Sequence, residues 1–140
     1  MHVVFDTNVL VSAVLFKGEL GVIPDLFEAG IVTPCFTEDT LSELHNTLSY
    51  PKLRDALERN DLDVQSVVNA VRQYARVYDP PARAVTAVKD DPSDNRFIEC
   101  ALVSGARFLV SGDQHLVRVR FYQDVIIINP REFIDLVFEE

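Results

Sequence analysis

The segment VVFDTN, residues 3–8, places an aspartate directly after a run of β-branched and aromatic residues. A short, wholly apolar run of this kind is typical of a strand that is buried on both faces of a sheet. The segment FLVSGD, residues 108–113, is built in the same way and ends in Asp113. In open α/β sheets, ligands bind beyond the carboxyl ends of the strands. Asp6 and Asp113 are therefore predicted to lie at the edge of a sheet where a ligand can bind.

Outward from these two segments, apolar runs alternate with helical patterns along the chain. The runs predict strands at residues 3–5, 31–32, 108–110 and 124–128, with a further strand somewhere in 77–88, where two consecutive prolines obscure the pattern. The periodic segments predict helices at residues 8–16, 23–29, 37–49, 63–78, 91–104 and 130–138. This alternation favours an α/β fold with a parallel sheet and helices on both faces.

Length and composition limit the classes of protein that the chain can belong to. Its 140 residues predict one domain over residues 1–140, and 48% hydrophobic with 25% charged residues excludes disorder, collagen and coiled coil. The chain contains no apolar run near the ~20 residues that span a bilayer, so we expect no membrane role. We expect a cytoplasmic protein, because the first residues lack the basic region of a signal peptide. The two cysteines show no zinc-binding spacing.

Two further acids belong to predicted helices. Asp94 stands in the first turn of its helix and heads an apolar stripe that begins at Phe97 and Ile98, whereas Glu43 lies on the flank of a leucine stripe. Each has an ordinary interpretation: Asp94 as an acid that complements the helix dipole, and Glu43 as a solvated surface residue. If the four acids gather, their repulsion raises their pKa values unless a cation neutralises them. Oxygen ligands favour Mg²⁺ or Mn²⁺, so the residues alone indicate a metal-dependent phosphoryl-transfer enzyme.

Three motifs in this order resemble the PIN domain. They are VVFDTNVLVSA (Val3–Ala13), TLSELHNTL (Thr40–Leu48) and DDPSDNRFIECALVSGARFLVSGDQHL (Asp90–Leu116), and together they cover most of the chain. The subgroup that they resemble most is the VapC-type toxins of type II toxin–antitoxin systems. The resemblance implies a three-layer α/β/α sandwich with a central parallel sheet of strand order 3-2-1-4-5.

The same resemblance implies a ribonuclease that depends on Mg²⁺ or Mn²⁺. Position by position, it makes Asp6, Glu43, Asp94 and Asp113 the catalytic and metal-binding acids. Asn8, Asp91 and Ser111 match supporting residues, with Ser111 in place of the more frequent threonine. It further implies an RNA substrate, a cognate antitoxin as partner and a homodimer.

The charge of the chain bears on how it would hold RNA. A formal net charge of −9 excludes binding to nucleic acid through bulk charge, so RNA would need a local basic rim. Residues near the motif acids could form one: Lys52, Arg54, Lys89, Arg96, His115, Arg118 and Arg120. The alternative is that residues 117–121 form an edge strand whose arginines face water, and that His115 only begins a helix or loop.

Two other functions remain open from the sequence. One is a phosphatase or phosphotransfer domain with a nucleophilic Asp6, although no second acid stands two residues after it. The other is a PIN-like module that acts through protein contacts. For contacts with a partner we expect exposed apolar side chains on the early helices, at Leu15, Phe16, Ile23, Leu26 and Phe27.

Overall fold

The structure is a computed structural model that describes residues 1–83 and 94–139. The strands within these ranges form one sheet in the order β3-β2-β1-β4-β6-β5. Neighbouring strands are parallel except β5 and β6, which are antiparallel. The strands are β1 (His2–Phe5), β2 (Thr33–Thr37), β3 (Arg76–Tyr78), β4 (Phe108–Val110), β5 (Phe121–Tyr122) and β6 (Val125–Ile128). The predicted order 3-2-1-4-5 is confirmed, with β6 as the fifth predicted strand and the short β5 as an additional edge strand.

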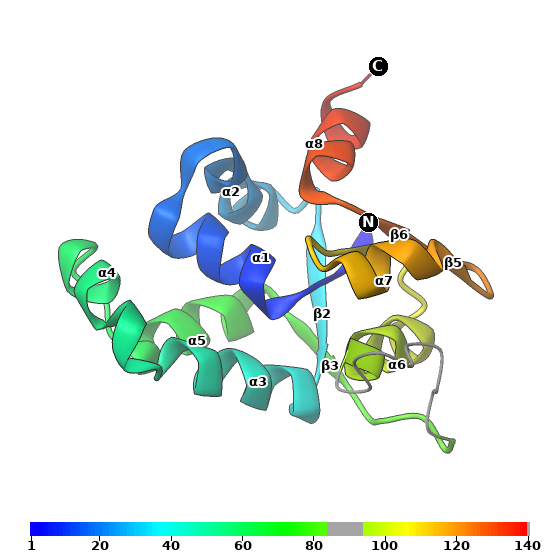
Figure 1. The fold of residues 1–140 in the computed structure, drawn as a ribbon, viewed down its shortest axis with the longest axis horizontal. Helices are drawn as coiled ribbons and strands as arrows, with labels where there is room; N and C mark the ends of the chain where they lie inside the picture. The colour runs from blue at the N-terminus through cyan, green and yellow to red at the C-terminus, as the bar shows by residue number, and fades with distance from the viewer. Residues whose placement is uncertain (84–93, 140) are drawn as a thin grey trace.

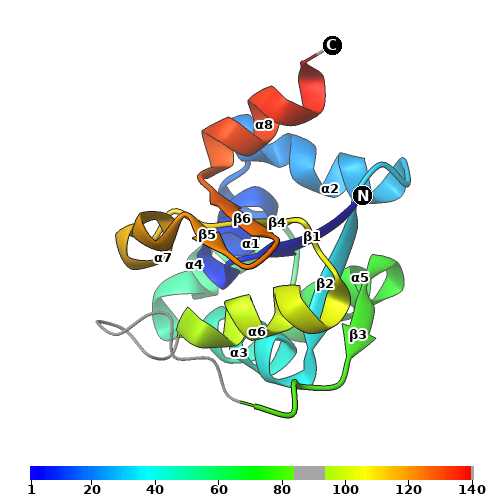
Figure 2. The ribbon, with the colours of Figure 1, turned by 90° about the vertical axis from the view of Figure 1, so that its right-hand side faces the viewer.

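Helices cover both faces of the sheet, as the sequence predicts. Figure 2 shows α6 on one side of strands β1, β4 and β6, and α2 and α8 on the other. The α-helices are α1 (Thr7–Val11), α2 (Val22–Glu28), α3 (Glu38–Leu48), α4 (Arg54–Arg59), α5 (Val64–Tyr74), α6 (Asn95–Ser104), α7 (Gln114–Val119) and α8 (Pro130–Phe138). A π-helical segment (Ser12–Phe16) continues α1, and 3₁₀ turns lie at Gly18–Gly21 and Pro51–Leu53. Within the described ranges, no helix has both the length and the apolar character that crossing a membrane requires.

Side chains that alternate along β1 divide the core into two halves. Val3 and Phe5 pack on the face that α1, α2, α3, α5 and α8 cover, and Val4 packs on the α6 face. On the first face the Phe5 ring makes edge-to-face contacts with Phe27 and Phe133, at 5.7 and 5.4 Å between ring centroids. A continuous apolar strand therefore supplies both layers, which holds β1 rigidly in the centre of the domain.

The second strand differs from its prediction. It runs from Thr33 to Thr37 and contains Pro34, whereas the sequence places it at residues 31–32 and takes the proline as its end. The N–H of Thr33 donates at 2.8 Å to the carbonyl oxygen of Met1, which directly precedes β1, so the nitrogen of Pro34 faces the opposite side. Pairing with β3 begins only at Cys35, and the missing N–H is therefore needed by neither neighbour.

Two other elements end or form differently from the predictions. Helix α5 ends at Tyr74, not Tyr78, because the backbone turns extended at Ala75 and enters β3. Residues 117–119 belong to α7, so the alternative of an edge strand over 117–121 is wrong except at Phe121, which begins β5. Leu116 is fully buried and Val119 packs against the same cluster, which is the spacing of a helix face, not of a strand.

The early helices do not present the expected apolar surface. Leu15, Ile23, Leu26 and Phe27 are all buried in the core, and only Phe16 is exposed. The expectation was wrong because these apolar side chains belong to the core cluster that residues of β1, α3, α5 and α8 also enter.

Candidate functional site

Two of the four acids are brought together by the pairing of β1 with β4. Phe5 lies opposite Val110 in the register, so the residues that follow leave the sheet side by side. The hydroxyl of Ser111, which is fully buried, donates to Asp6 Oδ2 at 2.7 Å and accepts from the N–H of Asp113 at 3.0 Å. Ser111 therefore connects the two aspartates directly.

Each of these aspartates also caps the helix that follows it. Asp6 Oδ1 accepts from the N–H of Asn8 at the start of α1, at 3.2 Å, and Asp113 Oδ1 accepts from the N–H of His115 at the start of α7, at 2.7 Å. One oxygen of each carboxylate thus fixes its orientation by capping a helix. Asn8 supports Asp6 through its backbone, while its own side chain is exposed.

The other two acids reach the same place from helices. Asp94, only 7% exposed, precedes α6, and Glu43 projects from α3, which Thr37 begins through a capping box with Thr40. All four acids line one pocket of about 180 Å³. Its lining residues are Asp6, Thr7, Asn8, Glu43, Asp94, Arg96, Phe97 and Asp113. A larger hollow of about 630 Å³ near the C-terminal end of α6 has a single acid, Asp124, in its lining.

Arg96 lies inside this pocket, where the sequence placed it on an RNA-binding rim. Its Nη1 is 2.7 Å from Glu43 Oε2 and 3.8 Å from Asp39 Oδ1. The Thr47 hydroxyl donates to the other oxygen, Glu43 Oε1, at 3.3 Å. Both oxygens of Glu43 are thus engaged by protein groups. The contact between Thr47 and Glu43 could be predicted from the sequence, because the two residues are four apart on one helix. The ion pair between Arg96 and Glu43 depends on the packing of α6 against α3 and leaves no signal in the sequence.

Of the other predicted rim residues that the structure describes, only His115 lies at the acids. Lys52 and Arg54 lie near α4, on the opposite side of the molecule from α6 and α7 (Figure 1). On α7, Arg118 is exposed, and just beyond it Arg120 forms an ion pair with Glu132 at 3.5 Å. Lys89 and the supporting Asp91 fall outside the described residues.

Burial dominates the electrostatics of Asp6. Desolvation raises the pKa of its carboxyl above the usual 3.8, and the negative charges of Asp113 and Glu43 raise it further. The hydrogen bonds from Ser111 and Asn8 act in the opposite direction, because they stabilise the charged form. A bound cation would counter both the desolvation and the repulsion.

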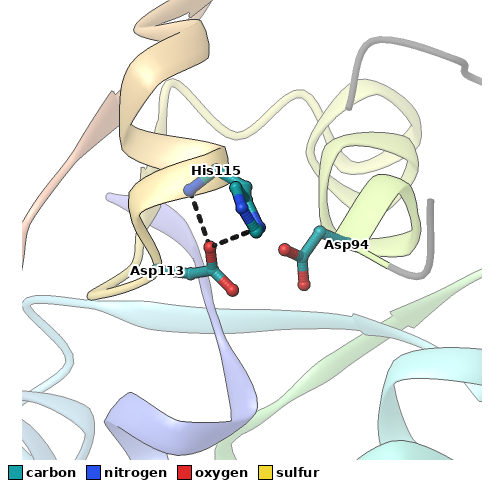
Figure 3. A group of neighbouring side chains, drawn as sticks. All are labelled: Asp94, Asp113 and His115. Atoms are coloured by element: carbon teal, nitrogen blue, oxygen red, sulfur yellow. Dashed lines mark hydrogen bonds and ion pairs between the residues drawn. The ribbon is translucent and has the colours of Figure 1, made fainter. Parts of the chain in front are cut away.

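The donors that lie closest together are Asp94, Asp113 and His115. One ligand atom from each lies within 4.8 Å of the others, and Figure 3 shows the His115 ring directed toward the space between the two carboxylates. Carboxylate oxygens are the donors that Mg²⁺ and Mn²⁺ prefer. The donor set therefore fits a divalent ion, with Asp94 and Asp113 at its centre and Asp6 adjoining through Ser111.

Comparison with known proteins identifies the family to which the chain belongs. A model of the PIN domain family matches residues 2–115, which include all four acids. The chain belongs to the PIN domain family. None of the curated protein sequences matches this PIN domain significantly. Among solved structures, it is similar to a chain in the crystal structure of VapBC2 from Rickettsia felis bound to a DNA fragment from their promoter. The two chains share 19% identity with a TM-score of 0.61 over 92% of this chain and 98% of the other, which shows a shared fold.

The raised pKa of Asp6 predicts how the stability of the metal-free protein depends on pH. The native state holds the Asp6 proton more tightly than the unfolded chain, so native stability falls as pH rises through the window above 3.8 and stays low beyond it. Asp6→Asn removes this loss. Its amide keeps one oxygen to accept from the N–H of Asn8 and turns its NH₂ toward the Ser111 hydroxyl, whose oxygen can accept. We expect Asp6→Asn to raise the melting temperature in EDTA at pH 7, with the gain shrinking as pH approaches about 4.

Calorimetric scans from pH 4 to pH 8 measure this effect, and Asp55→Asn on exposed α4 is the matched control. The control should shift the melting temperature little at any pH. The measured quantity is the change in melting temperature from wild type to Asp6→Asn at each pH. If this change is more negative at pH 7 than at pH 4, the charged carboxylate stabilises the fold and the prediction is wrong.

Proposed function

We propose that this PIN domain is a divalent-metal-dependent endoribonuclease that cleaves RNA phosphodiesters. The observation that carries the proposal is the convergence of Asp6, Glu43, Asp94 and Asp113, from four separate segments, on one pocket at the carboxyl edge of the sheet. Membership of the family supports the class of reaction. A phosphatase-like alternative has less support, because Asp6 already has one oxygen capping α1 and the other bound to Ser111.

The residues of the site divide into groups with separate roles. Asp94 and Asp113 would hold an ion, and Ser111 orients Asp6 beside them through its hydroxyl. When bound, Mg²⁺ or Mn²⁺ supplies positive charge for the phosphodiester oxygens and acidifies a water molecule. A carboxylate oxygen of Asp94 or Asp113 would accept the proton of the attacking water. Arg96 neutralises Glu43, so that substrate phosphate meets one negative charge fewer.

The first test is cleavage of a fluorogenic single-stranded RNA in the presence of Mg²⁺ or Mn²⁺. EDTA should abolish the activity, and Asp94→Asn should lower the rate by about a hundredfold or more, because it removes a charged group from the reacting centre. The matched control is Asp55→Asn, an exposed acid on α4 that should keep the wild-type rate.

All variants are purified identically, so that a contaminating nuclease would appear in each. Equal rates for wild type and Asp94→Asn would assign the cleavage to a contaminant and reject the proposal. Metal binding without any cleavage would favour the remaining alternative, a PIN-fold module that acts through protein contacts.

We also propose that the enzyme is the toxin of a toxin–antitoxin pair, with a cognate antitoxin as its protein partner. The support is the fold that it shares with a chain in the VapBC2 structure. An apolar groove of about 490 Å³ between α2 and α5 offers surface for such a partner. A homodimer and a cytoplasmic location remain predictions.

Growth of a bacterial host tests the pairing. Expression of the wild-type chain should arrest growth and expression of Asp94→Asn should not, because arrest depends on the nuclease site. Co-expression of the product of a small reading frame next to the gene should restore growth. Arrest by both wild type and Asp94→Asn would separate toxicity from the acidic site and contradict the proposal.

A further inference from the structure

His115 has a position that neither its predicted role on the rim nor helix capping explains. Its backbone N–H already serves Asp113, and its imidazole folds back over the same carboxylate. The Nδ1 atom lies 3.5 Å from Asp113 Oδ1, although the side chain as a whole is 40% exposed. Within the described part of the chain, Nδ1 is buried and makes no hydrogen bond. The ring is thus held in the site with a nitrogen that makes no hydrogen bond to any of the described residues.

The spacing of the three donors is close to what one ion requires. Metal–oxygen and metal–nitrogen bonds are about 2.0–2.2 Å for an ion such as Zn²⁺, so two donors on one ion lie at most about 4.4 Å apart. The donor atoms of Asp94, Asp113 and His115 lie within 4.8 Å of one another. Small side-chain shifts bring all three into bonding range, and the partly exposed imidazole is free to move.

A simpler role for His115 is an ion pair with Asp113. The contact does not support this role well, because 3.5 Å without hydrogen-bond geometry is a poor imidazole–carboxylate interaction. Asp113 Oδ1 is also already occupied by the backbone N–H of His115 at 2.7 Å. The imidazole therefore gains little from Asp113 alone and more from an ion shared with it.

We propose that His115 is a nitrogen ligand of the ion that Asp94 and Asp113 bind, and that it shifts the site from Mg²⁺ toward divalent transition ions. Imidazole suits transition ions, whereas Mg²⁺ prefers oxygen donors and keeps much of its water. Affinity should then rise from Mg²⁺ to Mn²⁺ to Co²⁺. This inference rests on the proposed metal nuclease and names the ion that its site selects.

Pulsed electron paramagnetic resonance of the Mn²⁺-loaded full chain reads the ligand directly. Wild type should show coupling of Mn²⁺ to an imidazole ¹⁴N, and His115→Asn should abolish that coupling while Mn²⁺ remains bound through the carboxylates. His45→Asn is the matched control, because His45 is exposed on α3 and should leave the coupling unchanged. Circular dichroism checks the fold of His115→Asn, whose backbone N–H still serves Asp113.

Titration calorimetry with Co²⁺ and Mg²⁺ measures the selectivity. His115→Asn should weaken Co²⁺ binding by about tenfold or more and Mg²⁺ binding much less, since a nitrogen donor contributes most to the transition ion. His115→Asp replaces the nitrogen by oxygen and should strengthen Mg²⁺ binding relative to Co²⁺.

The outcomes separate this proposal from the proposed function. If Mn²⁺ binds wild type without nitrogen coupling, or if His115→Asn leaves the ratio of Co²⁺ to Mg²⁺ affinity unchanged, His115 is not a ligand and the metal nuclease stands. If no ion binds the wild-type chain, the metal site fails and both proposals fall.

Discussion

The parallel pairing of β1 with β4 is the constraint on which the rest of the site depends. Phe5 and Val110 are register partners, so Asp6 and Ser111 leave the sheet together, and Asp113 follows two residues later. The fully buried Ser111 hydroxyl then donates to the Asp6 carboxylate and accepts from the backbone N–H of Asp113, which ties the two aspartates together. A shift of one residue in this register would turn Asp6 to the other face of the sheet and separate the acids. The apolar packing of Val3, Val4 and Phe5 on both faces fixes the register.

The same pairing of β1 with β4 helps to place negatively charged carboxylates where they are shielded from water. Asp6 and Asp94 are buried, and the desolvation of Asp6 is the largest contribution to its raised pKa. Three features offset this cost in part: the N-cap of α1, the Ser111 hydroxyl, and the pairing of Arg96 with Glu43. Asp94 and Asp113 are the two acids that share a possible metal position with His115. Carboxylates gathered in this way are suited to a cation.

Sequence reasoning succeeded where local chemistry decides the structure. The buried strands at β1 and β4 and the place of Asp94 at the head of an apolar stripe follow from residue type and periodicity. It failed where a distant neighbour decides. Pro34 is tolerated only because β3 starts one residue later, and Arg96 turns inward only because α3 packs against α6. Likewise, Leu26 and Phe27 are buried by elements whose positions the local sequence does not encode.

The family resemblance supplied what the residues alone could not, namely the selection of four acids from among many. Periodicity left Glu43 as an ordinary flank residue, and the structure agrees that it is partly exposed and engaged by Arg96 and Thr47. His115 shows the reverse case. Its position in the sequence favoured a residue that only begins a helix, and His115 does lie at the start of α7. The three-dimensional structure adds that its ring lies beside Asp94.

A crystal structure of the full chain grown with millimolar Mn²⁺, with anomalous diffraction measured at the manganese edge, tests the central claim most directly. The predicted result is an anomalous peak inside the pocket at bonding distance, about 2.0–2.3 Å, from carboxylate oxygens of both Asp94 and Asp113. A peak bound only by surface acids outside this pocket, or no peak although Mn²⁺ is present in excess, would contradict the assignment of the four acids to a metal centre.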